Sequence, residues 1–93
     1  MNLNNLGLCK AANGLICGED KVVEKIQQNK CYLVILASDT GKNTFKKIKD
    51  KTSFYNINLN TEHSSAELSS AIGQTNVHVI AITNRGFAKL LEK

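Results

Sequence analysis

The sequence lacks a long apolar run, a secretion signal and a cysteine framework. Its longest aliphatic run, Leu33 to Ala37, is far shorter than the ~18 residues of a membrane-spanning helix, so no membrane contact is expected. The N-terminus has no basic region followed by an apolar block, and we expect a cytoplasmic protein. The cysteines are odd in number and show no C-x-x-C spacing, which favours reduced, core-filling thiols at Cys9, Cys17 and Cys31.

The sequence also lacks the motifs of common catalytic and cofactor sites. No G-x-G-x-x-G occurs, and Gly41-Lys42-Asn43-Thr44 fails the phosphate-loop pattern because Leu36 stands where that loop needs its first glycine. The histidines show no metal-ligand spacing. We expect His63 in a turn beside a helix cap, and His78 in a strand, facing the core or its margin. The sequence therefore predicts no enzyme, no metal and no cofactor.

A small-molecule substrate is not expected either. The polar loop at residues 38–41 follows a buried strand, where open α/β sheets commonly bind ligands. Nothing beyond that position supports a small-molecule pocket there.

Alternating helices and strands dominate what is present. Apolar periodicity predicts nine elements: a helix ending near residue 12, a strand at 15–17, a helix at 19–29, a strand at 31–37, a helix at 42–52, a strand at 55–59, a helix from 64 to 73, a strand at 77–83 and a C-terminal helix. Ser64-x-x-Glu67 is a capping box, and Asn84 is placed to cap the last helix. A chain of 93 residues forms one domain, residues 1–93. Short connections between alternating elements predict a three-layer α/β/α sandwich.

The stretch from Leu15 to Ile26 combines a short strand, a glycine and an amphipathic helix. Gly18 suits a sharp strand-to-helix turn, because glycine adopts backbone angles that other residues resist. The free N–H groups at the start of the helix form a potential anion site. The plainer interpretation is that this joint serves only to build the core.

The charge pattern also leaves two interpretations open. Twelve basic and eight acidic residues give a net charge of +4 and a pI near 9.1, which permits nucleic-acid binding without requiring it. Lys42, Lys46 and Lys49 share one side of the predicted helix and could contact phosphates. The solvated outer face of an amphipathic helix explains them equally well, and no aromatic residues interleave for base stacking.

A family resemblance rests on several motifs in a fixed order. Gly18-x-Asp20-Lys21-x-x-Glu24 is followed by NKCYLVILASD at residues 29–39. Further motifs are Asn2 to Leu8, Ala71-Ile72-Gly73 and Thr83-x-x-Gly86-Phe87-Ala88-Lys89. Together they resemble the ribosomal protein L7Ae family of kink-turn RNA binders, and within it the small bacterial YlxQ-type branch. The similarity covers nearly the whole chain and implies a four-stranded mixed sheet inside the sandwich.

The resemblance implies an RNA-binding face built from three segments. Better-known family members dock the start of the second helix at tandem sheared G·A pairs through a Gly-x-Asn-Glu-x-x-Lys motif. The loops after the central strand and after the fourth helix add contacts and shield an extruded nucleotide. The residues of this chain at those positions are Gly18, Asp20, Lys21, Glu24, Ser38, Asp39, Gln74, Thr75 and Asn76.

Several of these positions depart from the family pattern. Asp20 replaces an asparagine and, when ionised, accepts hydrogen bonds without donating them. Lys21 replaces a glutamate and is a donor only, while Glu24 replaces a lysine that meets phosphate. The loop 74–76 is polar where the family is apolar. A good bidentate base contact is worth ~1–3 kcal/mol, so standard kink-turn recognition does not follow, although Lys21 could reach guanine O6 and N7 in a different readout.

The sequence leaves two functions open. The first is a monomeric protein that binds a structured, kink-turn-like RNA linked to the ribosome or translation, with ribosomal RNA or the ribosome as partner. The alternative is a protein–protein interaction module on the same fold that has lost kink-turn recognition. Glu24 and the polar loop 74–76 motivate the alternative.

Overall fold

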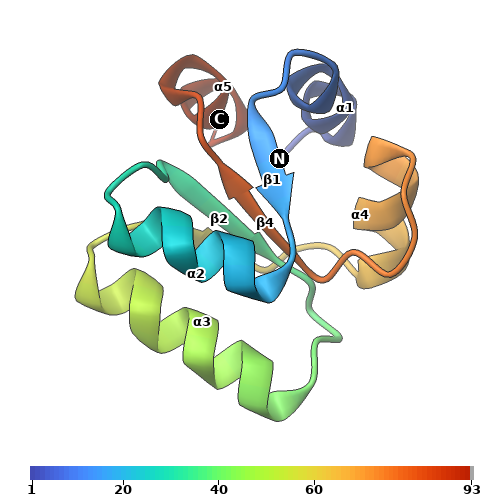
Figure 1. Cartoon of the computed structure of the whole chain (residues 1–93). Helices are drawn as coiled ribbons and strands as arrows, with labels where there is room; N and C mark the ends of the chain where they lie inside the picture. The colour runs from blue at the N-terminus through green and yellow to red at the C-terminus, as the bar shows by residue number, and fades with distance from the viewer. Residues whose placement is uncertain (93) are drawn as a thin grey trace.

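The computed structural model describes residues 1–92 and contains the alternation that the sequence predicts (Figure 1). In chain order the elements are α1 (Leu3–Ala11), β1 (Leu15–Cys17), α2 (Glu19–Gln27), β2 (Leu33–Leu36), α3 (Lys42–Phe54), β3 (Asn58–Asn60), α4 (Ser65–Ile72), β4 (Val79–Ile82) and α5 (Arg85–Leu91). No helix among residues 1–92 has the length and apolar character to cross a membrane.

The strands form one four-stranded mixed sheet in the order β1-β4-β2-β3. Strand β4 runs antiparallel to both neighbours, with Leu15 opposite Ile82 on one side and Leu36 opposite Val79 on the other. Strand β3 runs parallel to β2 at the far edge. The central position predicted for the apolar run at residues 31–37 is confirmed, because β2 pairs on both sides.

Helices cover both faces of the sheet, which confirms the three-layer sandwich (Figure 1). Leu33 and Ile35 of β2 point into the core beneath α1, α4 and α5, whereas Val34 and Leu36 point into the core beneath α2 and α3. Successive side chains of a strand alternate between faces, so one short apolar strand supplies both cores.

Local chemistry sets several helix ends as predicted. The side chain of Ser64 accepts from the backbone N–H of Glu67, and Glu67 reaches back to the N–H of Ser64, completing the capping box. Asn84 accepts from the N–H of Phe87 at the start of α5. His63 lies directly before this box, in the turn where it was predicted, with Nδ1 3.3 Å from Glu67 Oε2.

Three predicted strand starts are wrong, and the first is that of the strand placed at 31–37, which begins at Leu33. The strand placed at 55–59 begins at Asn58, because α3 continues to Phe54 and Asn56 then takes a left-handed turn with φ of 56°. The strand placed at 77–83 begins at Val79. His78 therefore lies before the strand and is exposed, not directed at the core or its margin.

Candidate nucleic-acid interface

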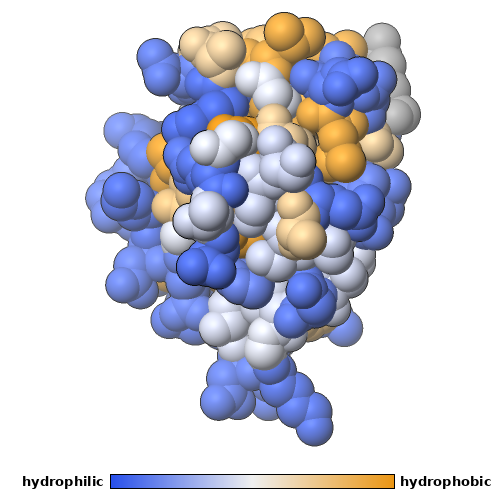
Figure 2. Space-filling model, turned by 90° about the vertical axis from the view of Figure 1, so that its right-hand side faces the viewer, coloured by the Kyte–Doolittle hydropathy of each residue, from blue (hydrophilic) through white to orange (hydrophobic). Residues whose placement is uncertain are grey.

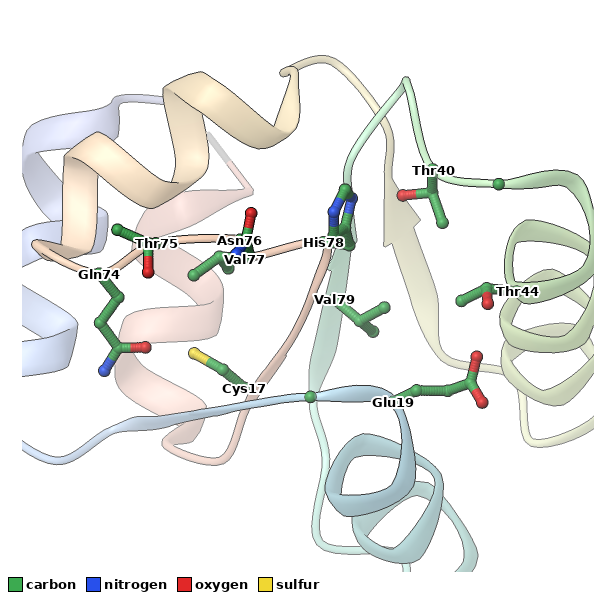
Figure 3. Close-up of a pocket in the computed structure, with 12 residues that line it drawn as sticks. Cys17, Glu19, Thr40, Thr44, Gln74, Thr75, Asn76, Val77, His78 and Val79 are labelled. Carbon is green, nitrogen blue, oxygen red and sulfur yellow. The ribbon is translucent and has the colours of Figure 1, made fainter.

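A cavity of about 410 Å³ opens at the end of the sheet where β1 and β2 finish and β4 begins (Figure 3). We call it the corner cavity. Three regions of the chain line it: the β1–α2 corner, the loop from β2 into α3, and the loop from α4 into β4. Its lining residues are Cys17, Gly18, Glu19, Thr40, Gly41, Thr44, Gln74, Thr75, Asn76, Val77, His78 and Val79.

Gly18 makes the sharp turn that the sequence predicted. Its φ of 102° and ψ of 141° lie in a region that side-chain-bearing residues rarely adopt. Its N–H donates to the carbonyl of Val79 at 3.1 Å, which extends the β1–β4 pairing to the rim of the cavity. Helix α2 starts at the next residue, so its first turn borders the opening.

Helix α4 anchors the opposite wall. The hydroxyl of Ser65 donates to the carbonyl of Val77 at 2.9 Å, and the N–H of Val77 donates to Ser69 Oγ at 2.9 Å. Gly73 and Asn76 both have positive φ, 68° and 55°, so the chain reverses tightly between them. The loop 74–76 therefore forms a compact turn at the rim of the cavity.

Thr40, Thr44 and Glu19 lie on one side of the cavity, and Gln74, Thr75 and Asn76 lie on the other (Figure 3). Thr40 Oγ1 is buried and has no hydrogen-bond partner within the described part of the chain. Figure 3 shows this hydroxyl on the side of Thr40 that faces His78. A buried hydroxyl without a partner is unusual, which makes Thr40 a candidate ligand contact.

Glu19 connects the cavity wall to α3. Its Oε2 lies 3.3 Å from Lys47 Nζ. Hydrogen bonds from Thr44 and Lys47 lower the pKa of the Glu19 carboxyl. Glu19 therefore stays ionised, and Lys47 balances its charge.

Two of the three cysteines lie in the core, and the third lines the corner cavity. Cys9 and Cys31 are buried, and burial raises the pKa of both thiols to about 11, which confirms them as inert core-filling side chains. Cys17 is only half-buried and lines the cavity, so for this residue the core-filling prediction holds in part. Burial raises its pKa, while the charges of Lys10 and Lys21 act in the opposite direction. These two lysines therefore bring positive charge to this wall.

The structure brings together some of the predicted site residues and separates others. The cavity includes Gly18 and the loop 74–76. Ser38 lines a neighbouring hollow on α3, and the Asp39 side chain accepts from the N–H of Ser65 at 2.8 Å. The other three, Asp20, Lys21 and Glu24, are exposed on α2 and are not among the residues that line the cavity.

Three comparisons with known proteins agree. The sequence model of the Ribosomal protein L7Ae/L30e/S12e/Gadd45 family matches residues 3–92. The chain belongs to this family. It is 37% identical over 86 residues to "RNA-binding protein YlxQ" of Bacillus subtilis (strain 168), covering 92% of this chain and 86% of that protein. It is 38% identical over 87 residues to the protein of the same name from Enterococcus faecium, covering 94% and 84%.

Solved structures also share this fold. A Bacillus halodurans protein described as having unknown function superposes with a TM-score of 0.93 at 38% identity, covering 97% of this chain and 91% of that one. The Giardia lamblia 15.5kD RNA binding protein superposes with a TM-score of 0.83 at 16% identity, covering 97% and 83%. The second likeness concerns the fold alone. The four-stranded mixed sheet expected of the family is confirmed.

The family motif directed attention to α2 and two loops, and it missed eight of the twelve lining residues, among them Glu19, Thr40 and Thr44. Glu19 directly follows Gly18, and Thr40 directly follows Asp39, so adjacency to predicted residues was the available signal. Thr44 carried no comparable signal, because it approaches the cavity only when α3 packs beside α2.

The surface around the cavity is mostly hydrophilic (Figure 2). In that view, pale residues of intermediate hydropathy fill the centre of the face, hydrophilic residues lie at its sides and bottom, and hydrophobic residues lie along the top. A hydrophilic projection at the bottom lies at the height of the start of α3 in Figure 1. This face therefore suits a hydrated, polar partner better than an apolar one.

Proposed function

We propose that this protein binds a folded RNA with the end of the molecule that carries the corner cavity. The single observation that carries the proposal is the cavity itself, which joins the Gly18 corner, the loop 74–76 and Thr40 in one fixed recess. Two relatives at 37% and 38% identity bear the name RNA-binding protein YlxQ. A nucleotide turned out of a kinked RNA helix would enter the recess, while neighbouring base pairs would meet the start of α2.

The contacts differ from those of the usual family motif. Lys21, exposed on α2, would donate to guanine O6 and N7 or to a phosphate. Thr40 Oγ1 would find in the nucleotide the hydrogen-bond partner that it lacks among residues 1–92. Asp20 would accept from base amino groups, and the Ser38-Asp39 loop would support the rim. We further propose that the RNA is ribosomal or otherwise linked to translation.

Binding measurements on three RNAs test the proposal. The probes are a kink-turn RNA, a straight duplex of matched composition and a ribosomal RNA fragment, titrated at several salt concentrations. We expect tighter binding to at least one folded RNA than to the straight duplex. Equal, weak and steeply salt-dependent binding to all three RNAs would show that the protein binds them only by non-specific electrostatic attraction. That result would contradict the proposal.

Matched variants locate the contact. If Lys21 donates hydrogen bonds to a base, Lys21→Gln should weaken binding to the folded RNA by about 10-fold or more. Lys30→Gln, an exposed lysine at the opposite end of the sheet, is the control with the same charge change. Glu24→Lys, which places a cation where an acid now faces the RNA, should tighten binding. Equal effects of Lys21→Gln and Lys30→Gln would exclude a specific contact at α2.

Exposed acids on α2 favour a second candidate, a protein partner on the same face. Asp20 and Glu24 are both exposed, and Glu24 makes no ion pair within residues 1–92, where it accepts only from Gln28 Nε2 at 3.2 Å. Retention of ribosomes or another complex on the immobilised protein after nuclease treatment would support this candidate. Loss of that association with the RNA would exclude it.

A further inference from the structure

Helix α3 concentrates the positive charge of the chain. Its thirteen residues carry five lysines and one aspartate, a net charge of +4, which equals the net charge of the whole protein. Helix α2, packed beside it on the same face of the sheet, carries three acids and two lysines. The basic surface next to the corner cavity is therefore the α3 side and not the α2 side.

A hollow of about 440 Å³ lies along α3, next to the corner cavity. We call it the α3 hollow, and its lining residues are Ser38, Thr40, Lys42, Phe45, Lys46 and Lys49. Thr40 lines both recesses, so the two lie next to each other on either side of this residue. Three lysines and two hydroxyls surround the α3 hollow, and none of its lining residues within 1–92 is acidic.

The three lysines of the hollow are free to bind an anion. Lys42, Lys46 and Lys49 repeat at i+4 and i+3, so they form a strip about 10 Å long on one side of the helix. Within residues 1–92 none of them forms an ion pair, although Asp50 lies one turn from Lys46. Lys47, which points elsewhere, is paired with Glu19.

We propose that this strip, Lys42, Lys46 and Lys49, binds the phosphates of the RNA strand that leaves the corner cavity. The inference rests on the proposed RNA-binding function and adds a path for the strand. Asp20 and Glu24 repel phosphates on the α2 side, whereas the α3 hollow offers cations and hydroxyls directly beyond Thr40. The strand therefore passes over Thr40 and along α3.

Salt dependence of binding tests the strip. The variant Lys42→Gln/Lys46→Gln/Lys49→Gln is compared with Lys30→Gln/Lys51→Gln/Lys89→Gln, which loses the same charge at positions that do not line the α3 hollow. Each phosphate contact contributes about 0.7–0.9 to the slope of log K against log salt, so the strip variant should have a slope shallower by about 2 and bind roughly 10- to 100-fold more weakly at ~0.1 M salt. The control variant should show a much smaller change in both quantities.

The RNA probe provides the second half of the test. One kink-turn RNA carries a single-stranded extension beyond its bulge, and the other ends there. The extension should strengthen binding of the wild-type protein and of the control variant, and leave binding of the strip variant unchanged. An equal gain for all three proteins, or identical slopes for the strip and control variants, would overturn the strip as a phosphate site.

Failure of the proposed RNA-binding function would give a different set of results from failure of the lysine strip. If wild-type protein does not distinguish kinked from straight RNA, the proposed function fails. The strip is still judged in that case by titration with a single-stranded RNA, for which the strip variant should again bind more weakly than the control. Equal binding of the two variants to that probe would also reject the strip. Circular dichroism of each variant verifies that it is folded.

Discussion

Helices α2 and α3 cover the same face of the sheet but present different surfaces to solvent. Inside, Val22 and Ile26 of α2 and Ile48 of α3 are fully buried in one core. Outside, α2 carries a slight excess of acids and α3 a net charge of +4. Packing constrains the inner residues of both helices in the same way, whereas the outer residues are free to serve different partners.

The largest expected effect tests whether the buried side chains of α2 and α3 contribute equally to the stability of their shared core. Ile26→Ala and Ile48→Ala each remove a side chain with no exposed area from the same core, so each should lower the free energy of unfolding by about 2–5 kcal/mol. Urea denaturation followed by circular dichroism measures the loss. If either variant does not fold, Ile→Val at the same positions should cost about 0.5–1.5 kcal/mol.

A surface substitution is the control for this pair. Lys46→Ala on the outer face of α3 should change stability by no more than about 0.5 kcal/mol. A loss at Ile48 no larger than the loss at Lys46 would contradict the shared core and with it the equivalence of the two helices.

The next effect concerns the glycines that precede the two helices. Both Gly18 and Gly41 cap their helix without a side chain, and at both positions an added Cβ meets nothing within 4 Å. Gly18 has a φ of 102°, so Gly18→Ser should destabilise by about 1–3 kcal/mol through backbone strain. Gly41 has φ of −56° and ψ of 149°, close to the angles of the natural cap Ser64, so Gly41→Ser should stabilise by up to about 1 kcal/mol.

Thermal or urea unfolding of the two serine variants measures this difference. The two variants should change the free energy of unfolding in opposite directions, because the backbone angles of the two glycines differ. Equal destabilisation at both glycines would show that the corner geometry at Gly18 has no special role.

The inner surfaces were predictable from the sequence for a physical reason. Burial imposes a period on apolar residues, and Leu33 to Leu36 alternate between the two cores as a buried strand must. Caps such as Ser64 depend on contacts within four residues, which the sequence shows directly. Predictions failed at the strand ends, where Asn56 stops α3 and delays β3, because that boundary depends on competition between neighbouring elements.

The candidate site was less predictable, since three separate segments build it. Gly18 and the loop 74–76 were predicted from a family resemblance, but Thr40 and Thr44 reach the cavity only through packing of the loop and of α3. The role of Asp39 illustrates the same limit. Its carboxylate was predicted as part of the RNA-binding face, yet it already accepts a hydrogen bond from the N–H of Ser65.

The smallest expected effect lies where the outer surfaces of α2 and α3 meet, at Glu19. Hydrogen bonds from Thr44 and Lys47 hold the pKa of this carboxyl below its usual value of 4.5. A carboxyl whose pKa is lowered in the folded state adds stability above its unfolded pKa and loses it as the pH falls through the folded pKa. Thr44→Val and Lys47→Gln should therefore each raise the pKa of Glu19. Carboxyl-carbon NMR titration of Glu19 measures both shifts, with Lys46→Gln as a control that changes the same charge without touching Glu19. An unchanged pKa in both variants would mean that α2 and α3 share a core but have no coupling at the cavity wall.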